Sequence, residues 1–289
     1  MRLELQRVNS DYSGFLQLTE LAHGTSDLAL KAVELDMGAA TWVDANMCAP
    51  LGAILYRVSR GLNAVRLTHL RAKVRDILAK NGFLSTYGEA KRPDRFGTTI
   101  EYMRFEPKDA RYFAEYVESR LARKEIPKMS AALLKKFRES IFEIFSNAVI
   151  HSETNLGIFA CGQFFPGQHR LDFSVADLGI GIQQNLMKKR GIVLSAEDAI
   201  NWATEGKNTT KTGPIPGGLG LKLLREFISL NHGRMQIASD RGYWELTANG
   251  QERTDNFPYP FPGTVVNIEI NTADTSAYRL TSEPPDDIF

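Results

Sequence analysis

The stretch LDFSVADLGIGIQQN, residues 171–185, places an acidic, glycine-containing turn directly after an apolar run. The run at 171–176 predicts a strand, and Asp177, Gly179 and Gly181 follow where that strand ends. An Asp-Gly turn after a strand is common and indicates no function by itself. The meaning of this carboxylate therefore depends on which other groups the chain supplies around it.

A polar stripe runs along the helix that is predicted over residues 133–152. Glu139, Glu143, Asn147 and His151 are spaced four residues apart, so each step drifts by only about 40° around the helix. A solvated surface face is the alternative interpretation, but such faces usually carry Lys/Glu pairs. Glu, Asn and His are better suited to binding a ligand.

A glycine-rich segment, GPIPGGLGLKLL at residues 213–224, runs straight into a predicted helix. The free amides and the dipole of a helix N-terminus favour anions, and glycines let backbone N–H groups approach phosphate oxygens closely. A flexible loop ahead of a helix is the alternative for this segment taken alone.

Composition limits the possible functions. The 289 residues suggest about two domains, and the net charge of +1, without a Lys/Arg run that contains aromatics, does not suggest direct nucleic-acid binding. The two cysteines, Cys48 and Cys161, show no metal-binding spacing and predict no disulfide framework. We find neither a signal peptide nor an apolar run of about 18 residues, so we expect a cytoplasmic protein without membrane contact.

The order of predicted elements divides the chain. The first hundred residues alternate strand, helix, strand and helix, which is typical of a small α/β layer structure; these elements lie at 28–38, 48–60, 64–70 and 73–83, and an edge strand at 100–107 follows. Long helices and a late run of strands then favour an α+β sandwich; the helices lie at 109–126, 133–152, 196–204 and 220–233, and the strands at 156–165, 169–179, 234–240, 242–248 and 264–270. We expect residues 249–263 to form a turn-rich loop.

The polar helix stripe, the acidic turn and the glycine-rich segment, taken in their order along the chain, resemble the motifs of the GHKL ATPase superfamily. This superfamily includes gyrase, Hsp90, histidine kinases and anti-sigma-factor serine kinases. The similarity covers residues 107–271. Glu143-x-x-x-Asn147, with Ala148 and His151 behind it, resembles the first motif of the family, and Asp177-x-Gly179-x-Gly181 resembles the second. Gly218-x-Gly220-Leu221 resembles the third motif, and GTVVNIEI, which contains Thr264, resembles the closing strand of the family.

The resemblance implies an α+β two-layer sandwich, the Bergerat-type ATP-binding fold, with ATP and Mg²⁺ as cofactors. It implies that Asp177 accepts a hydrogen bond from the exocyclic amine of adenine, where guanine would present an acceptor. Asn147 would supply a hard oxygen to Mg²⁺ at the phosphates, and Glu143 would orient or deprotonate an attacking water or hydroxyl.

Further contacts follow from the same resemblance. Residues 183–216 would form a lid over the nucleotide, and EGKNTTK within it offers Lys207, Thr209, Thr210 and Lys211 to the phosphates. For His151, a phosphate contact and a capping or packing role are equally compatible with the sequence. The remaining cofactor-binding positions that the motifs imply are Gly179, Gly181, Gly218, Leu219, Gly220, Leu221 and Thr264.

The segment TWVDANMCAPLGAILYRV, residues 41–58, resembles the STAS domain of anti-sigma-factor antagonists, and the match covers about residues 25–90. Phosphorylated members carry a Ser soon after the Asp, within an Asp-Ser-Ser-Gly stretch. Here the stretch reads Asp44-Ala45-Asn46-Met47 and has no hydroxyl, so phosphorylation at this place is not expected. The alternatives are a docking surface, an STAS-like domain that has lost its switch role, and a generic small α/β domain.

We therefore expect an STAS-like α/β domain at residues 1–105, a GHKL ATP-binding domain at 106–272 and an acidic flexible tail at 273–289. The expected function is an ATP- and Mg²⁺-binding regulator that hydrolyses ATP, or that phosphorylates or sequesters an STAS-like or sigma-factor-like protein. A non-catalytic ATP-gated adaptor is an alternative, and a homodimer is possible. A histidine kinase is disfavoured, since none of the five histidines lies in a dimerising helical hairpin ahead of the ATPase region.

Overall fold

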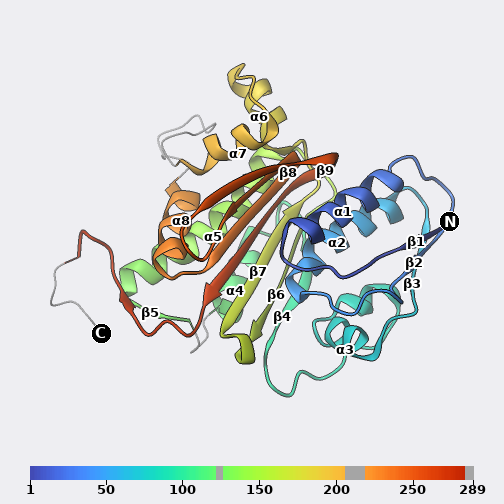
Figure 1. Cartoon of the computed structure of the whole chain (residues 1–289), viewed down its shortest axis with the longest axis horizontal. Coiled ribbons are helices and arrows are strands. Elements are labelled where there is room, and N and C mark those ends of the chain that lie inside the picture. Colours follow the sequence, from blue (N-terminus) through green and yellow to red (C-terminus); the bar gives the residue numbers. More distant parts are fainter. Residues whose placement is uncertain (122–125, 206–218, 284–289) are drawn as a thin grey trace.

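The computed structural model describes residues 1–121, 126–205 and 219–283, and it has a mixed α+β fold (Figure 1). The strands are β1 (Arg2–Glu4), β2 (Ala32–Asp36), β3 (Ala64–Thr68), β4 (Thr99–Phe105), β5 (Lys128–Met129), β6 (Ile158–Phe165), β7 (Arg170–Asp177), β8 (Arg234–Leu246), β9 (Glu252–Asn271) and β10 (Ala277–Tyr278). The α-helices are α1 (Tyr12–Gly24), α2 (Cys48–Arg60), α3 (Ala72–Lys80), α4 (Ala110–Leu121), α5 (Ala131–His151), α6 (Gly181–Arg190), α7 (Ala196–Thr204) and α8 (Leu219–Leu230).

Five strands form an antiparallel central sheet in the order β4-β6-β7-β9-β8. The middle strand, β7, pairs with β6 on one side and with β9 on the other, where Ala176 lies opposite Val265. This register brings Asp177, the last residue of β7, next to Thr264. The antiparallel sheet with its separate helices confirms the predicted α+β class for this part of the chain.

The N-terminal residues form a smaller parallel sheet in the order β1-β2-β3. Helix α1 connects β1 to β2, helix α2 connects β2 to β3, and α3 follows β3. Such strand–helix–strand connections are typical of a parallel layer. The small α/β unit that the alternating elements predict is therefore confirmed.

Helices cover both faces of the central sheet (Figure 1). Helices α4, α5 and α8 pack on one face, around buried side chains that include Phe137, Phe145 and Phe227. Helices α1 and α2 of the N-terminal unit pack on the other face, where Phe159 and Cys161 of β6 join their core. The N-terminal unit thus shares the hydrophobic core on this second face with the central sheet.

A buried polar network joins the N-terminal unit to the sheet. Asn46, in the short 3₁₀ helix η1 (Ala45–Met47) before α2, is fully buried, and its Nδ2 lies 3.0 Å from Ser174 Oγ and 2.6 Å from Asn267 Oδ1. It also donates to Ser10 Oγ at 2.9 Å. Because buried polar groups require partners, this network fixes the turn around Asn46 against β7 and β9.

Strand pairing extends the central sheet beyond the predicted boundary between residues 105 and 106. Strand β4, which we assigned to the first domain, pairs with β6 through Phe105 and Ile158. At the other end of the chain, β10 pairs in parallel with β5. Residues 277–278, within the segment that we expected to be a flexible tail, are therefore part of a two-stranded ladder.

The expected loop at residues 249–263 was wrong, because β9 begins at Glu252 and forms a long hairpin with β8. The prolines of this segment had indicated a loop rather than a strand. Pro258 and Pro260 lie between the paired residues Asn256 and Phe261, at an irregularity of the ladder where missing N–H donors are tolerated. Phe257 stacks on Tyr12 of α1 at a ring separation of 5.2 Å.

Two α-helices, α1 and α6, and three short strands, β1, β5 and β10, were not predicted. Strand β1 is short, and helix α1 begins where the Asp11 side chain accepts from the Gly14 amide. Helix α6 includes the first residues of the expected lid, 183–190, and it ends at Gly191 in the left-handed conformation. None of the helices in the described ranges is long and apolar enough to cross a lipid bilayer.

Candidate functional site

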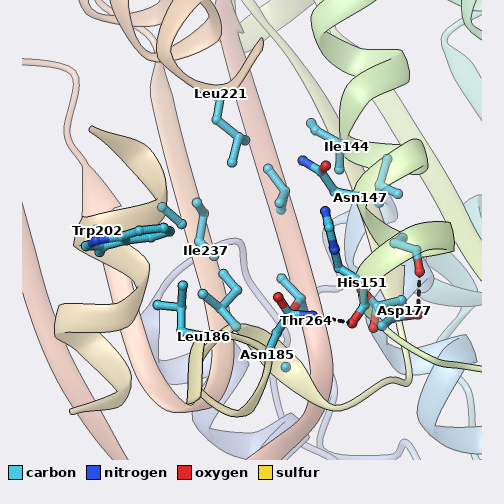
Figure 2. Close-up of a pocket in the computed structure, with 17 residues that line it drawn as sticks. Ile144, Asn147, His151, Asp177, Asn185, Leu186, Trp202, Leu221, Ile237 and Thr264 are labelled. Carbon is cyan, nitrogen blue, oxygen red and sulfur yellow. Dashed lines mark hydrogen bonds between the residues drawn. The ribbon is translucent and has the colours of Figure 1, made fainter. Parts of the chain in front are cut away.

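A cavity of about 130 Å³ opens between α5, the strands β7, β8 and β9, and the helices α6, α7 and α8 (Figure 2). A single water needs only about 10–15 Å³ by this kind of measure, so the cavity accommodates a larger group. Six of the residues that the sequence predicts as site residues line it, namely Asn147, His151, Asp177, Gly181, Leu221 and Thr264. Residues from three separate motifs therefore meet at one cavity.

Asp177 supplies a buried carboxylate to this cavity, with a relative exposure of 5%. Burial raises the pKa of Asp177 to about 7, although hydrogen bonds from the backbone amides of Gly179 and Thr264 act in the opposite direction. The Gly179 amide lies 2.8 Å from Asp177 Oδ1. Near neutral pH this side chain can therefore either accept hydrogen bonds as a carboxylate or hold a proton.

The glycines after Asp177 are required by geometry. A Cβ atom on Gly179 would lie 2.1 Å from the carbonyl oxygen of Ser152, which follows α5. Gly181 has a φ of +74°, a conformation that L side chains rarely adopt, and it begins α6 at the cavity wall. The glycines thus let the chain pass close to the end of α5 and then turn into α6.

Helix α5 places Asn147 and His151 on the cavity. Ser130 caps the start of the helix, since its side chain accepts from the Leu133 amide, and the helix continues to His151. Asn147 and His151, four residues apart, both line the cavity, as the spacing predicts, and Figure 2 shows them on the same wall. Glu139, the first residue of the predicted stripe, is 62% exposed in its side chain and lies near Lys135.

His151 is held by α6. Its Nδ1 lies 2.9 Å from Lys189 Nζ, and its carbonyl oxygen accepts from Asn185 Nδ2 at 2.8 Å. An ammonium group can only donate, so Nδ1 is the acceptor in this contact. Both roles that the sequence left open for His151 are thus compatible with the structure, since the residue packs under α6 and also lines the cavity.

Glu143 has a different position from the other motif residues. It is absent from the cavity lining, and its Oε2 accepts a hydrogen bond of 2.9 Å from the amide of Gly220 in the first turn of α8. A Cβ atom on Gly220 would lie 2.4 Å from this oxygen. The carboxylate therefore caps the helix N-terminus, and the glycine is needed for the close approach.

Several lining residues were missed by the sequence analysis. Leu186 of α6 and Trp202 of α7 lie across the cavity from Asn147 and His151, and Asn185 of α6 lines the cavity next to the end of α5 (Figure 2). The only available signal was the amphipathic pattern of AEDAINWAT, which predicts α7 but not its orientation. Ser239 connects this side to the sheet, since its Oγ accepts from the Ile182 amide at 2.9 Å and lies 2.9 Å from Thr264 Oγ1.

Some predicted contacts lie outside the described residues. Lys207, Thr209, Thr210, Lys211 and Gly218 belong to the range 206–218, and of Leu219 only the backbone, at the start of α8, is described. Within the described ranges, no group of three or more His, Cys, Asp or Glu side chains could hold a metal ion. A metal at this cavity would therefore need ligands of another kind, such as the Asn147 amide oxygen and the oxygens of a bound anion.

Neither a protein-family model nor a curated protein sequence matches this chain. Its function must therefore be inferred from its own residues.

Proposed function

We propose that the cavity binds ATP together with Mg²⁺, and that the protein is a GHKL-type regulator that acts on a protein partner. The observation that carries this proposal is the position of Asp177. It presents a buried carboxylate to a cavity that is otherwise lined mainly by apolar side chains, among them Val175, Ile237 and Val266.

This arrangement suits an adenine ring. A flat apolar base would be desolvated by the aliphatic walls, and a few polar groups would fix its orientation. The carboxylate of Asp177 can accept from the exocyclic amine of adenine, whereas guanine presents a carbonyl oxygen at that place, and two acceptors repel. Thr264 lies beside Asp177 and adds a hydroxyl to the same end of the cavity.

The other end of the cavity suits phosphates. Leu221 lines it from the first turn of α8, and a helix N-terminus favours an anion; of the amides there, that of Gly220 is bonded to Glu143. Asn147 offers an amide oxygen of the kind that Mg²⁺ accepts, and Mg²⁺ when bound would neutralise charge on the phosphates. The chemistry of the residues present thus fits the nucleotide and its metal.

The fold supports the same proposal at a coarser level. An antiparallel sheet with α5 and α8 on one face is what a Bergerat-type ATP-binding fold requires, and we assign residues 99–271 to it. We infer that the N-terminal parallel layer is an STAS-like unit. Because Asn46 is buried against the sheet, its turn is not accessible to a kinase active site and would not be the phosphate acceptor.

A second candidate is an ATP-gated adaptor without catalysis. The contact between Glu143 and the Gly220 amide favours it, since a carboxylate that caps α8 is not facing a water or hydroxyl in the cavity. In this case nucleotide binding would shift the conformation and the affinity for a partner.

One experiment separates these functions. The purified protein and its Glu143→Ala variant are incubated with γ-labelled ATP and Mg²⁺, and the label is followed. Free phosphate that is lost in the variant would identify an ATPase, and label retained on protein would identify a kinase. Tight ATP binding without either would identify the adaptor, and the absence of ATP binding would refute the proposal.

A further inference from the structure

A second cavity, of about 490 Å³, lies apart from the first and shares no lining residue with it. It forms where the end of α3, the segment at residues 88–98, strand β4 and the last turn of α4 meet. Four basic side chains line it, Lys80, Lys91, Arg92 and Arg120, against only two acidic ones, Asp94 and Glu101.

Two carboxylates form ion pairs with the four basic side chains. Asp76 Oδ2 lies 2.6 Å from Lys80 Nζ, and its Oδ1 lies 3.3 Å from Arg92 Nη1. Glu101 likewise binds Lys91 Nζ at 2.5 Å and lies 3.5 Å from Arg120 Nη2. Each carboxylate thus holds two cations, and the cations remain in excess.

Donors remain free on these cations. An ammonium group has three N–H donors and a guanidinium has five, and each of the four side chains uses one ion-pair contact in the structure. Their side chains are 27–51% exposed, so water or a solute can reach them. A cleft with an excess of one charge concentrates counter-ions of the opposite sign.

The wall of this cavity is held in place by its own hydrogen bonds. Asp94 Oδ2 accepts from the Thr99 amide at 2.7 Å and from Thr99 Oγ1 at 2.8 Å, and these bonds contribute to lowering the pKa of Asp94. The backbone amide of Arg92 donates to the Ala79 carbonyl at the end of α3 at 3.1 Å. The basic side chains therefore extend from a fixed backbone, and the Asp94 carboxylate is already hydrogen-bonded to Thr99.

We propose that this cavity binds a small molecule that carries a dianionic phosphate group. Two guanidinium groups and two ammonium groups supply the kind of donors that bind phosphate oxygens, and the four cations still outnumber the three carboxylates of Asp76, Asp94 and Glu101. This site is independent of the proposed ATP pocket.

The test uses inorganic phosphate and pyrophosphate as probes, with sodium acetate at equal ionic strength as the monoanion control. Thermal unfolding and calorimetry are compared for the wild type, Arg92→Gln and Arg120→Gln. Arg111→Gln is the matched control, because Arg111 lies on α4 like Arg120 and has one glutamate partner, Glu115, outside the cavity. Asn147→Ala reports any contribution from the first cavity.

We expect phosphate and pyrophosphate, but not acetate, to raise the unfolding temperature of the wild type, Arg111→Gln and Asn147→Ala. In Arg92→Gln and Arg120→Gln, the Kd for pyrophosphate should rise at least tenfold, while the unfolding temperature without ligand stays close to that of the wild type. Equal responses to acetate, unchanged affinity in both cavity variants, or loss of the effect in Asn147→Ala would each overturn the proposal.

Discussion

Oε2 of Glu143 and the backbone amide of Gly220 lie 2.9 Å apart, so the carboxylate that the motif implies as catalytic is also a cap for α8. The two roles can be separated by substitution. Glu143→Ala removes both the cap and the catalytic carboxylate, whereas Glu143→Gln keeps an oxygen that can accept from Gly220.

We expect Glu143→Ala to lower the free energy of unfolding by about 1 kcal/mol, the usual cost of a lost helix cap, and Glu143→Gln to lower it by less. Both should lose ATP turnover if Glu143 is the base. Urea unfolding and phosphate release measure the two effects. Full turnover in Glu143→Gln would show that the carboxylate has only the structural role.

Asp177→Asn should have opposite effects on ligand binding and on stability. The folded protein holds the proton of Asp177 with a pKa of about 7, against an ordinary value of 3.8, so the wild type loses stability as the pH rises between these values. The variant lacks this penalty, and we expect it to be more stable than the wild type at pH 8 by on the order of a few kcal/mol.

The same variant should bind ATP more weakly, by on the order of 1–3 kcal/mol, since an amide cannot replace the carboxylate as a full acceptor. Urea unfolding at pH 5 and pH 8, with ATP titrations of the same samples, checks both effects. Unchanged ATP affinity would remove Asp177 from the nucleotide site, and a stability difference independent of pH would contradict the raised pKa.

ATP binding should release protons near pH 7. A hydrogen bond from adenine to Asp177 favours the ionised carboxylate, so binding should lower a pKa that burial has raised to about 7. Calorimetry in two buffers of different ionisation enthalpy measures the number of protons released. The control is Asp177→Asn at a saturating ATP concentration, in which this release should disappear.

Asn147→Ala should remove the Mg²⁺ dependence of ATP binding. Asn147 is the only residue of the cavity lining to which we assign a metal contact, and a single lost oxygen ligand weakens a site that otherwise depends on phosphates and water. ATP titrations with Mg²⁺ and with EDTA give the measure. If the dependence persists, the metal is held by another group.

Gly179→Ala should destabilise the protein by several kcal/mol, because its Cβ would lie 2.1 Å from the Ser152 carbonyl oxygen and the backbone would have to move. Gly167→Ala is the matched control, since nothing lies within 4 Å of the atom that it adds. Thermal unfolding compares the two. Equal unfolding temperatures would show that the end of α5 adapts to the extra methyl group.

The meeting of distant motifs at one cavity was predictable, because each motif carries a local signal. The spacing of Asn147 and His151 fixes one helix face, and Asp177 follows an apolar strand, so the two elements need only pack together. The orientation of Glu143 toward α8 could not be predicted, since it depends on how close the helices α5 and α8 lie.

Other features depend on tertiary contacts that have no local pattern. The prolines at 258 and 260 indicate a loop, yet they are accommodated in β9 at an irregular part of the ladder. The position of Asn46 was also unpredictable, because its partners Ser174 and Asn267 are more than a hundred residues away. Sequence periodicity gives the faces of elements but not which faces meet.

The N-terminal layer covers part of the central sheet, so it limits which fragments of the protein can be made. Phe159 and Cys161 of the central sheet are fully buried in a core that they share with α1 and α2. A fragment that begins at β4 would expose these side chains and leave the Ser174 and Asn267 pair without its Asn46 donor. The half that contains the first cavity and the N-terminal half are therefore one unit of expression and purification, and they should be obtained together, as the intact chain.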